Sequence, residues 1–203
     1  MNELVIIGGG GHGVSVFEVV RSINTYKVIG FVDNQTNTDL ARHGIQHLCT
    51  DNDLDKILSD NTSVAIGLGQ IGSPSPRMTI VKKLNEQIAN LPVIRAQSAV
   101  VSPKCEVGRG TVIFHQALIN ADSHIGKFNI VNSGAIVEHG VITDDFVHIA
   151  PGAVVLGDVT IGMGSFIGAG AVLREGVSIG ANCLIGAGTF VNEDIMDGQT
   201  ARK

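Results

Sequence analysis

A six-residue period runs through the second half of the chain, from Val101 to Val191. Fifteen of the sixteen residues at this spacing are aliphatic, and only Thr143 departs from the pattern. In an α-helix six residues advance by about 240°, so these side chains would point in three directions. A period of six is a multiple of the two-residue strand period. The pattern therefore predicts short strands separated by turns, with the aliphatic side chains facing a common axis.

Small residues occupy the position four residues after each aliphatic one, with Asn129 as the main polar exception. If each hexad forms one side, three hexads close a coil and residues 18 apart stack. Hexapeptide periodicity of this kind is typical of a β-helix, here of about five coils. Cys105 and Cys183 belong to the small set and are expected to act as buried apolar fillers. A β-helix that serves only as a scaffold is the alternative.

The first half predicts an α/β domain. The stretch "ELVIIGGGGHGVSVFEVVRSI" fits a strand, a glycine turn and an amphipathic helix. Further strands are expected in "YKVIGFVDN" and "TSVAIGLG", followed by a helix from about Pro76 to Asn90. Strands that alternate with helices favour a parallel sheet. We expect a Rossmann-like domain over residues 1–95 and a β-helix over 96–203. The apolar face of the first helix is expected to contain Val16, Phe17, Val20 and Ile23.

The glycine turn fits GxGxxG at Gly8, Gly10 and Gly13, and Asp33 lies 20 residues beyond Gly13. This is the dinucleotide fingerprint, with an acid for a ribose hydroxyl. A turn that holds the phosphates of another nucleotide at a helix N-terminus is the rival interpretation, and we favour it. About 95 residues precede the repeat, too few for two mononucleotide-binding halves. His12 also adds a donor that nicotinamide cofactors do not require. Glycines that merely permit a tight turn are a third possibility.

Composition excludes several classes of function. The net charge is −5 without clusters of Lys or Arg, which argues against a nucleic-acid partner. No apolar run reaches the ~18 residues of a membrane span, and the start lacks the features of a signal peptide. We therefore expect a cytoplasmic protein. The cysteines, Cys49, Cys105 and Cys183, form neither a disulfide framework nor a CxxC metal site.

The combination of "GGGGHG" with "NSGAIVEHGVITDDFVHIAPGAVVLGDV" and hexads such as "IGMGSF", "IGAGAV" and "IGANCL" carries a family resemblance. It resembles the sialic acid O-acetyltransferase group of hexapeptide-repeat sugar acetyltransferases, which includes the N-acetyltransferases of bacillosamine and perosamine synthesis. The resemblance implies a left-handed parallel β-helix and a homotrimer with active sites between neighbouring prisms. It also implies acetyl-CoA as co-substrate without a metal, and a UDP- or GDP-linked 4-amino sugar of bacterial surface glycan synthesis as acceptor.

The resemblance also implies roles for particular residues. His139 matches the catalytic base, Asn132 a polar residue that positions it, and Gly157 a backbone position near the thioester carbonyl. The residues implied at the acetyl-CoA site are His148, Gly157 and, along the pantetheine arm, Ala169 and Ala187. The residues implied in the nucleotide-sugar pocket are Gly10, Gly11, His12, Asp33, Asn34 and Gly67.

The repeat explains how His139 could work. Its neighbours one coil away are Ala121 and Gly157, so the imidazole has room for substrates. Successive strand residues point to opposite sides, so Glu138 is expected to face another chain or solvent. A histidine with an unperturbed pKa of ~6.5 can accept the proton of an attacking amine near pH 7. A backbone N–H near Gly157 is the candidate oxyanion donor, and direct transfer needs no cysteine nucleophile.

The sequence departs from the family pattern at two places. Many relatives carry an acid directly after the histidine, where this chain has Gly140, and Asp144 and Asp145 are candidates to replace it. Relatives often end in a "GxPAK"-like tail that helps enclose CoA, whereas the last residues here are "MDGQTARK".

Three other functions stay open at this point. One is O-acetylation of sialic acid, and another is a non-catalytic nucleotide-sugar-binding scaffold. The third is a γ-type carbonic anhydrase, for which His115, His124, His139 and His148 are the candidate zinc ligands. His115 and His139 share the third hexad position while His124 and His148 share the sixth, which argues against three ligands converging on one metal.

Overall fold

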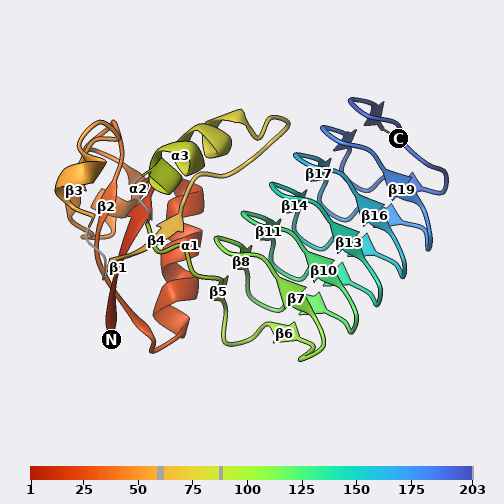
Figure 1. Ribbon diagram of the computed structural model, residues 1–203, viewed down its shortest axis with the longest axis horizontal. Helices are drawn as coiled ribbons and strands as arrows, with labels where there is room; N and C mark the ends of the chain where they lie inside the picture. The colour runs from red at the N-terminus through yellow and green to blue at the C-terminus, as the bar shows by residue number, and fades with distance from the viewer. Residues whose placement is uncertain (59–61, 87–88, 203) are drawn as a thin grey trace. The chain divides into compact units, whose positions relative to one another are not determined.

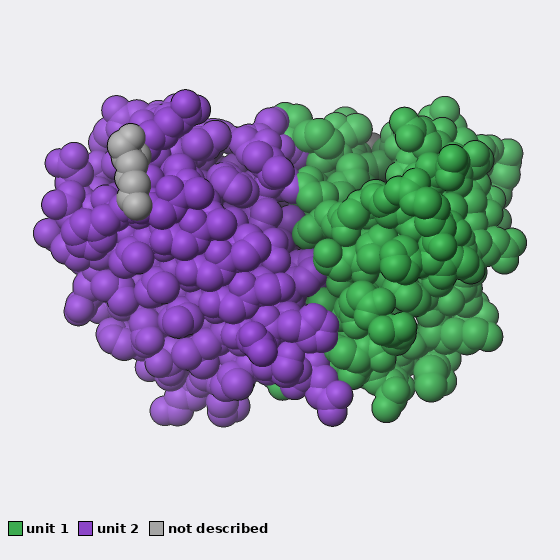
Figure 2. All heavy atoms as spheres, turned by 180° about the vertical axis from the view of Figure 1, so that it is seen from behind, with its two compact units in different colours: residues 1–69, 75–95 green, residues 70–74, 96–203 purple. Residues whose placement is uncertain are grey.

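The computed structural model describes residues 1–58, 62–86 and 89–202. The chain divides into two compact units, which are coloured separately in Figure 2. The first contains Met1–Gly69 and Ser75–Arg95, and the second contains Gln70–Pro74 and Ala96–Lys203. Gln70–Pro74, expected in the first domain, thus packs with the β-helix. Within the described ranges, no helix has the length and apolarity needed to cross a membrane.

The first unit is built on a parallel four-stranded sheet of order β3-β2-β1-β4 (Figure 1). Its strands are β1 (Asn2–Ile7), β2 (Tyr26–Val32), β3 (His47–Cys49) and β4 (Ser63–Ile66). Its helices are α1 (Gly11–Ser22), α2 (Asp39–Arg42) and α3 (Ser75–Glu86), with a 3-10 turn, η1 (Leu54–Lys56). The predicted α/β domain is confirmed, and its small sheet contains one mononucleotide-binding half rather than two.

Burial explains why these segments form a layered unit. Leu4–Ile7 of β1 and Ser63–Ile66 of β4 are buried throughout, as in parallel strands covered on both faces. The buried side of α1 consists of Gly13, Val16, Val19 and Val20. Phe17, which we predicted on that face, is only half-buried, and Val19 takes its place. The buried stripe of α1 is therefore centred one residue position away from the predicted one.

The prediction for the third helix was too long. α3 ends at Glu86, and part of the remaining predicted stretch, residues 87–88, lies outside the described residues. Asn90 is not helical, because it forms a parallel bridge with Ser63 and its carbonyl accepts the Val64 N–H at 2.8 Å. The backbone of Asn90, which the sequence pattern assigned to the helix, thus pairs with β4 instead. The helix α2 and the strand β3 were not predicted from the sequence.

The second unit is a parallel β-helix of two-residue strands, as predicted (Figure 1). From β6 to β21, each strand pairs with the strand 18 residues away, so residues 18 apart stack in three sheets. The last strand, β22, pairs with β20 at a separation of 16 residues. Sheet 1 contains β8 (Val112–Ile113), β11 (Ile130–Val131), β14 (His148–Ile149), β17 (Phe166–Ile167), β20 (Leu184–Ile185) and β22 (Thr200–Ala201). Sheet 2 contains β6 (Val100–Val101), β9 (Leu118–Ile119), β12 (Ile136–Val137), β15 (Val154–Val155), β18 (Val172–Leu173) and β21 (Phe190–Val191). Sheet 3 contains β7 (Glu106–Val107), β10 (His124–Ile125), β13 (Ile142–Thr143), β16 (Thr160–Ile161) and β19 (Ser178–Ile179). β5 (Ile94–Arg95) precedes them.

The six-residue series forms the core of the β-helix. All its members from Ile113 to Val191 are buried, while Val101 and Val107, near its start, are half-buried. Cys183 is buried as a filler, whereas Cys105 is half-buried. Thr143, the polar departure, accepts a hydrogen bond from Asn129 Nδ2 at 2.6 Å. The two polar exceptions therefore satisfy each other, as buried polar groups must.

The turn residue of every hexad from 110 to 188 has a positive φ. This left-handed conformation favours glycine, and Gly140 is one example, with φ of 67°. Asp122 and Asp158 hold the equivalent position with φ of 60° and 59°. Aspartate is among the residues that tolerate this conformation best. Gly140, which follows His139, therefore adopts the left-handed conformation that this turn needs, but aspartate can occupy the same turn position.

Candidate functional site

His139 lies in the turn that follows β12, between sheets 2 and 3, and its side chain is exposed. It is not packed inside the β-helix. Gly157 is the stacked residue of the next coil, and a Cβ at Gly157 would lie 2.5 Å from His139 Cε1 and 2.8 Å from Nε2. The imidazole therefore lies directly against the main chain of Gly157. Only a glycine leaves this space for the ring.

Gly157 also presents a main-chain donor beside the imidazole. Its carbonyl accepts the N–H of Gly176 at 2.9 Å. In the part of the chain that the structure describes, the Gly157 N–H has no hydrogen-bond acceptor. An exposed imidazole and an open N–H donor are therefore adjacent, and an acyl transfer through a tetrahedral intermediate needs a base and a donor of this kind.

Asn132 contacts a different histidine from the one expected. Its Nδ2 lies 3.1 Å from Nε2 of His148, and its Oδ1 accepts the Ser133 N–H at 2.8 Å. Among the hydrogen bonds of the described residues, none joins Asn132 to His139. The repeat stacks residues 18 apart, and His148 follows Asn132 by 16, so the spacing places the two residues on neighbouring coils but does not predict that their side chains meet.

His148 is 5% exposed and belongs to a buried cluster. Its Nδ1 donates to the carbonyl of Gln70 at 2.6 Å, and its ring meets that of Phe166 edge-on at 5.1 Å. Gln70, also buried, donates from Nε2 to the carbonyls of Phe146, at 2.8 Å, and Gly164, at 3.2 Å. The residue expected at the acetyl-CoA site thus anchors the segment Gln70–Pro74 to the β-helix. Sequence reasoning missed this segment because its partners are 76 or more residues away.

Ala169 and Ala187 lie on another corner of the β-helix, in the turns between sheets 1 and 2. Both are exposed, and they stack, with the N–H of Gly188 donating to the Ala169 carbonyl at 2.8 Å. His139 and Gly157 lie at the opposite end of sheet 2. Within one chain, the structure therefore keeps the two predicted parts of the acetyl-CoA site apart.

The glycine turn of the first unit serves close packing. A Cβ at Gly13 or at Gly67 would overlap the Gly8 carbonyl oxygen, and Gly8 itself has a φ of 103°. The turn thus brings β1, β4 and α1 together, the packing use of glycine in dinucleotide-type folds. Arg77 of α3 is fully buried and donates to the carbonyl of Leu68 at 2.5 Å. Burial lowers the pKa of Arg77 to about 10.

Asp33 lies at the end of β2, facing the same turn. Its Oδ2 accepts the Gly9 N–H at 2.8 Å and its Oδ1 accepts the Gln35 N–H at 2.9 Å. The carboxylate is therefore fixed beside a pocket of about 120 Å³, which also includes Asn34 and Asp51. Asn34 bonds to Asp51, with Nδ2 3.0 Å from Oδ2.

The remaining residues implied in this pocket surround the start of α1. Gly10 is the N-cap, and a Cβ there would meet nothing within 4 Å. Gly11 and His12 form the first turn, and the His12 side chain lies 3.5 Å from a Cβ built on Gly69. The first N–H groups of a helix attract anions. The turn can therefore hold a phosphate with Asp33 nearby for a hydroxyl group.

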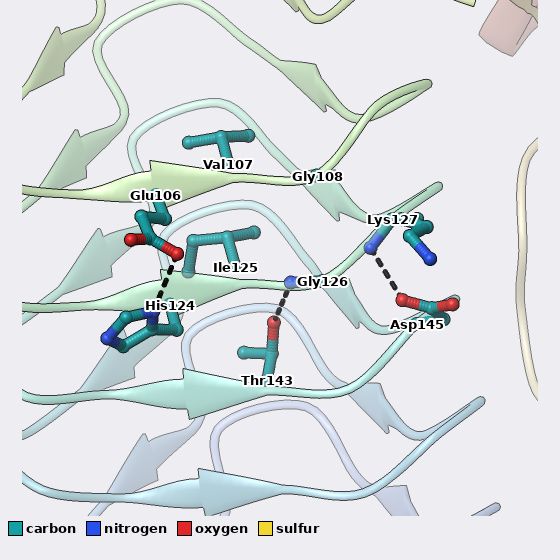
Figure 3. A pocket seen from close by; sticks show the side chains of 9 residues that line it. All are labelled: Glu106, Val107, Gly108, His124, Ile125, Gly126, Lys127, Thr143 and Asp145. Atoms are coloured by element: carbon teal, nitrogen blue, oxygen red, sulfur yellow. Dashed lines mark hydrogen bonds and ion pairs between the residues drawn. The ribbon is translucent and has the colours of Figure 1, made fainter.

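A second hollow, of about 270 Å³, lies on sheet 3 (Figure 3). His124 Nδ1 lies 3.2 Å from Glu106 Oε2 there, and Asp145 Oδ1 accepts the Lys127 N–H at 2.7 Å. None of the residues to which the family resemblance assigns a role lines this hollow, although His124 and Asp145, considered above for other roles, do. In the described ranges no group of three or more His, Cys, Asp or Glu side chains could hold a metal ion. His115, the other histidine considered for zinc, lies near Ser98, with Nδ1 3.0 Å from Oγ.

The acids suggested to compensate for Gly140 lie elsewhere. Asp144 and Asp145 follow β13, beyond sheet 3, in a different turn from His139. A third acid, Asp158, lies one coil beyond Gly140 at the same turn position, and a Cβ at Gly140 would overlap its Oδ1. The sequence contained the signal, because 158 is 140 plus 18.

The two cysteines of the second unit give no support for a covalent intermediate. Cys183 is buried and Cys105 lies next to Glu106. Partial burial, and then the charge of Glu106, raise the pKa of the Cys105 thiol. The thiolate is the nucleophilic form of cysteine, and this environment disfavours it.

Comparison with known proteins agrees with this geometry. Residues 3–84 match the model of the PglD N-terminal domain, and residues 140–175 and 158–193 match the bacterial transferase hexapeptide model of six repeats. The acetyltransferase domain of PglB from Neisseria gonorrhoeae is 33% identical, with a TM-score of 0.91, over 98% of this chain and 96% of that chain. Its complex with acetyl coenzyme A is similar to the same degree, with a TM-score of 0.90. A point mutant of perosamine N-acetyltransferase from Caulobacter crescentus, in complex with CoA and GDP-perosamine, is 32% identical over 99% of this chain and 93% of that chain, with a TM-score of 0.91.

Proposed function

The chain belongs to the hexapeptide-repeat sugar acetyltransferases that carry a PglD-type N-terminal domain, and from that premise we propose that it N-acetylates a nucleotide-linked 4-amino sugar. The enzyme is an acetyltransferase with acetyl-CoA as co-substrate. The observation that carries the proposal is the exposed His139 imidazole lying against Gly157, whose N–H has no acceptor among the described residues.

The proposed reaction is direct transfer. Neutral His139 accepts a proton from the amine as its nitrogen attacks the thioester carbonyl carbon, and a C–N bond forms. The oxyanion of the tetrahedral intermediate accepts a hydrogen bond from the Gly157 N–H. The C–S bond then breaks, the electron pair leaves on the CoA sulfur, and His139 returns the proton to give the CoA thiol. The products are an acetamido sugar and CoA.

The first unit supports the nucleotide part of the proposal. Its glycine turn opens α1, and the Asp33 carboxylate is fixed next to that turn by the Gly9 N–H. We assign the phosphates to the α1 N-terminus and a ribose hydroxyl to Asp33. The similar enzyme from Caulobacter crescentus was solved with GDP-perosamine, which makes GDP- and UDP-linked 4-amino sugars the acceptors to test first. Such a reaction belongs to bacterial surface glycan synthesis, and its substrates suit a cytoplasmic enzyme.

A homotrimer completes the proposal. The outward-facing residues of sheet 2 are all apolar, unlike those of sheet 3, and form one stacked series: Val100, Leu118, Ile136, Val154, Val172 and Phe190. A continuous apolar face on a regular sheet favours self-association. If three copies turned this face toward a threefold axis, the His139 corner of one would meet the Ala169 corner of the next. A cyclic trimer would thereby bring together the His139 corner and the Ala169 corner, which lie apart within one chain.

The test measures CoA release with a thiol reagent from acetyl-CoA and a panel of UDP- and GDP-4-amino sugars. We expect release with at least one amine acceptor, and mass spectrometry should show the acetyl group on nitrogen. His139→Ala should lower kcat by roughly 10²–10⁴, the usual contribution of a general base. His124→Ala, an exposed histidine in the sheet 3 hollow, is the matched control and should retain activity. Transfer to sialic acid hydroxyl groups, or tight nucleotide binding without any transfer, would contradict the proposal.

A further inference from the structure

Four residues form a square at the His139 corner. His139 and Gly140 follow β12, and Gly157 and Asp158 follow β15 one coil later. The register pairs Ile136 with Val154 and Val137 with Val155, so 139 stacks on 157 and 140 on 158. The Asp158 N–H donates to the His139 carbonyl at 3.0 Å, which links the two coils at this point.

The side chains of His139 and Asp158 extend in opposite directions, each toward the coil of the other. The imidazole of His139 extends over Gly157, 2.5 Å from the position of an added Cβ. The carboxylate of Asp158 extends back over Gly140, where its Oδ1 occupies the space of an added Cβ. Each glycine makes room for the side chain of the other coil. The imidazole and the carboxylate therefore both lie at this turn, each over the glycine of the neighbouring coil.

The orientation of the His139 ring decides which of its nitrogens can donate a hydrogen bond to the Asp158 carboxylate. Nε2 is 2.8 Å and Nδ1 3.2 Å from an added Cβ at Gly157, so Nε2 is the ring nitrogen that lies nearer to Gly157. Nδ1 is bonded to Cγ and stays closer to the main chain of its own coil, toward which Asp158 extends. A carboxylate at Nδ1 would hold the tautomer that leaves Nε2 free as the base, and would stabilise the imidazolium that forms.

We propose that Asp158 is the positioning residue for His139, and that its carboxylate accepts the Nδ1–H of the imidazole during acetyl transfer. This inference rests on the proposed function. In the described part of the chain no hydrogen bond joins the two side chains, and both are exposed. Contacts of this kind commonly tighten when substrates exclude water. Asp122 at the same turn position one coil earlier, and Glu175 one coil after Gly157, are the other acids that stack in these columns.

The first experiment compares Asp158→Asn with Asp122→Asn as matched control. Asparagine tolerates the left-handed turn conformation, as Asn182 does in the same series with φ of 54°. Asp158→Asn should lower kcat at least about tenfold with KM for acetyl-CoA nearly unchanged, because an orienting acid acts on the base rather than on binding. Asp122→Asn and Glu175→Gln should keep kcat. Thermal melting confirms that each variant is folded.

The second experiment moves the carboxylate from position 158 to position 140. Gly140→Asp alone would overlap Asp158, whereas the double variant Gly140→Asp with Asp158→Gly places one carboxylate and one glycine in exchanged positions. Aspartate is compatible with φ near 60° there, as Asp122 and Asp158 illustrate. The double variant should regain at least about tenfold in kcat over Asp158→Gly, since the acid returns to the same space.

The outcomes separate the two proposals. Unchanged kcat in Asp158→Asn, together with an inactive His139→Ala, would overturn the role of Asp158 and leave the acetyltransferase mechanism in place. A rise in KM alone, or a kcat that the double variant does not recover, would also overturn it. Full activity in His139→Ala would overturn the general-base mechanism, and with it this inference.

Discussion

Asn132 donates a hydrogen bond from its amide to Nε2 of His148, 3.1 Å away, and so contacts a histidine other than His139. The Ser133 N–H fixes the direction of the amide by donating to Oδ1. Nδ1 faces the Gln70 carbonyl and Nε2 faces the Asn132 amide nitrogen, so these contacts fit the tautomer with its proton on Nδ1. His148 is thus a buried link between Asn132 and the segment Gln70–Pro74.

His148→Ala should release this segment. The substitution leaves the Gln70 carbonyl and the Asn132 amide without these partners and removes buried volume, at a cost of about 2–4 kcal/mol in unfolding free energy. Hydrogen exchange measured by mass spectrometry should accelerate in peptides containing residues 70–74. His124→Ala is the control, because His124 has the equivalent strand position in sheet 3 but is exposed. Equal exchange in both variants would show that His148 does not anchor the segment.

Gly157→Ala should impair catalysis through His139. The new methyl group would occupy the ring's position, so the imidazole must turn away. We expect kcat to fall about 10²-fold, comparable to losing much of the general base. The control is a double-mutant cycle, in which Gly157→Ala is added to His139→Ala. If the glycine acts only by making room for the ring, the second substitution should cost little more. Additive losses would instead assign Gly157 an independent contribution such as the oxyanion donor.

Ile136→Glu on sheet 2 should break the homotrimer that we propose. A charge on the apolar series would be desolvated in the assembly without a partner, which strongly opposes association. Sedimentation should show a trimer for the unmodified chain and smaller species for the variant. Thr160→Glu on sheet 3 is the matched control, since it places the same charge on the polar sheet. A fully active monomer of the unmodified chain would exclude a site shared between copies.

Asn129→Ala should destabilise the β-helix without affecting the chemistry directly. The Asn129 side chain donates to Thr143 at 2.6 Å and accepts the Val147 N–H at 2.7 Å, all in the core. The substitution leaves the Thr143 hydroxyl and the Val147 N–H buried without these partners, and each loss costs about 1–3 kcal/mol of unfolding free energy. Urea unfolding should detect a loss of roughly 2–5 kcal/mol. Asn120→Ala, which removes a half-buried bond to Glu138, should cost under about 1 kcal/mol.

The sequence predicted the β-helix well because its repeat is one-dimensional. Residues 18 apart touch whatever the rest of the chain does, so the buried column from Ile113 to Val191 follows from counting. The same counting places His139 against Gly157. It fails for Phe17, for Asn90 and for Gln70, whose surroundings come from segments with no fixed sequence separation.

The sequence alone determined the α/β domain, the six-residue winding and the exposed His139 on a column of small residues, because periodicity fixes which side chains share a face. Only the tertiary structure decided that Asn132 bonds to His148 and that Ala169 and His139 lie on different corners. It also decided that the Asp158 side chain fills the space over Gly140. These outcomes depend on the direction in which each side chain leaves its turn. Side-chain direction at a turn is set by packing between coils, which spacing along the chain does not encode.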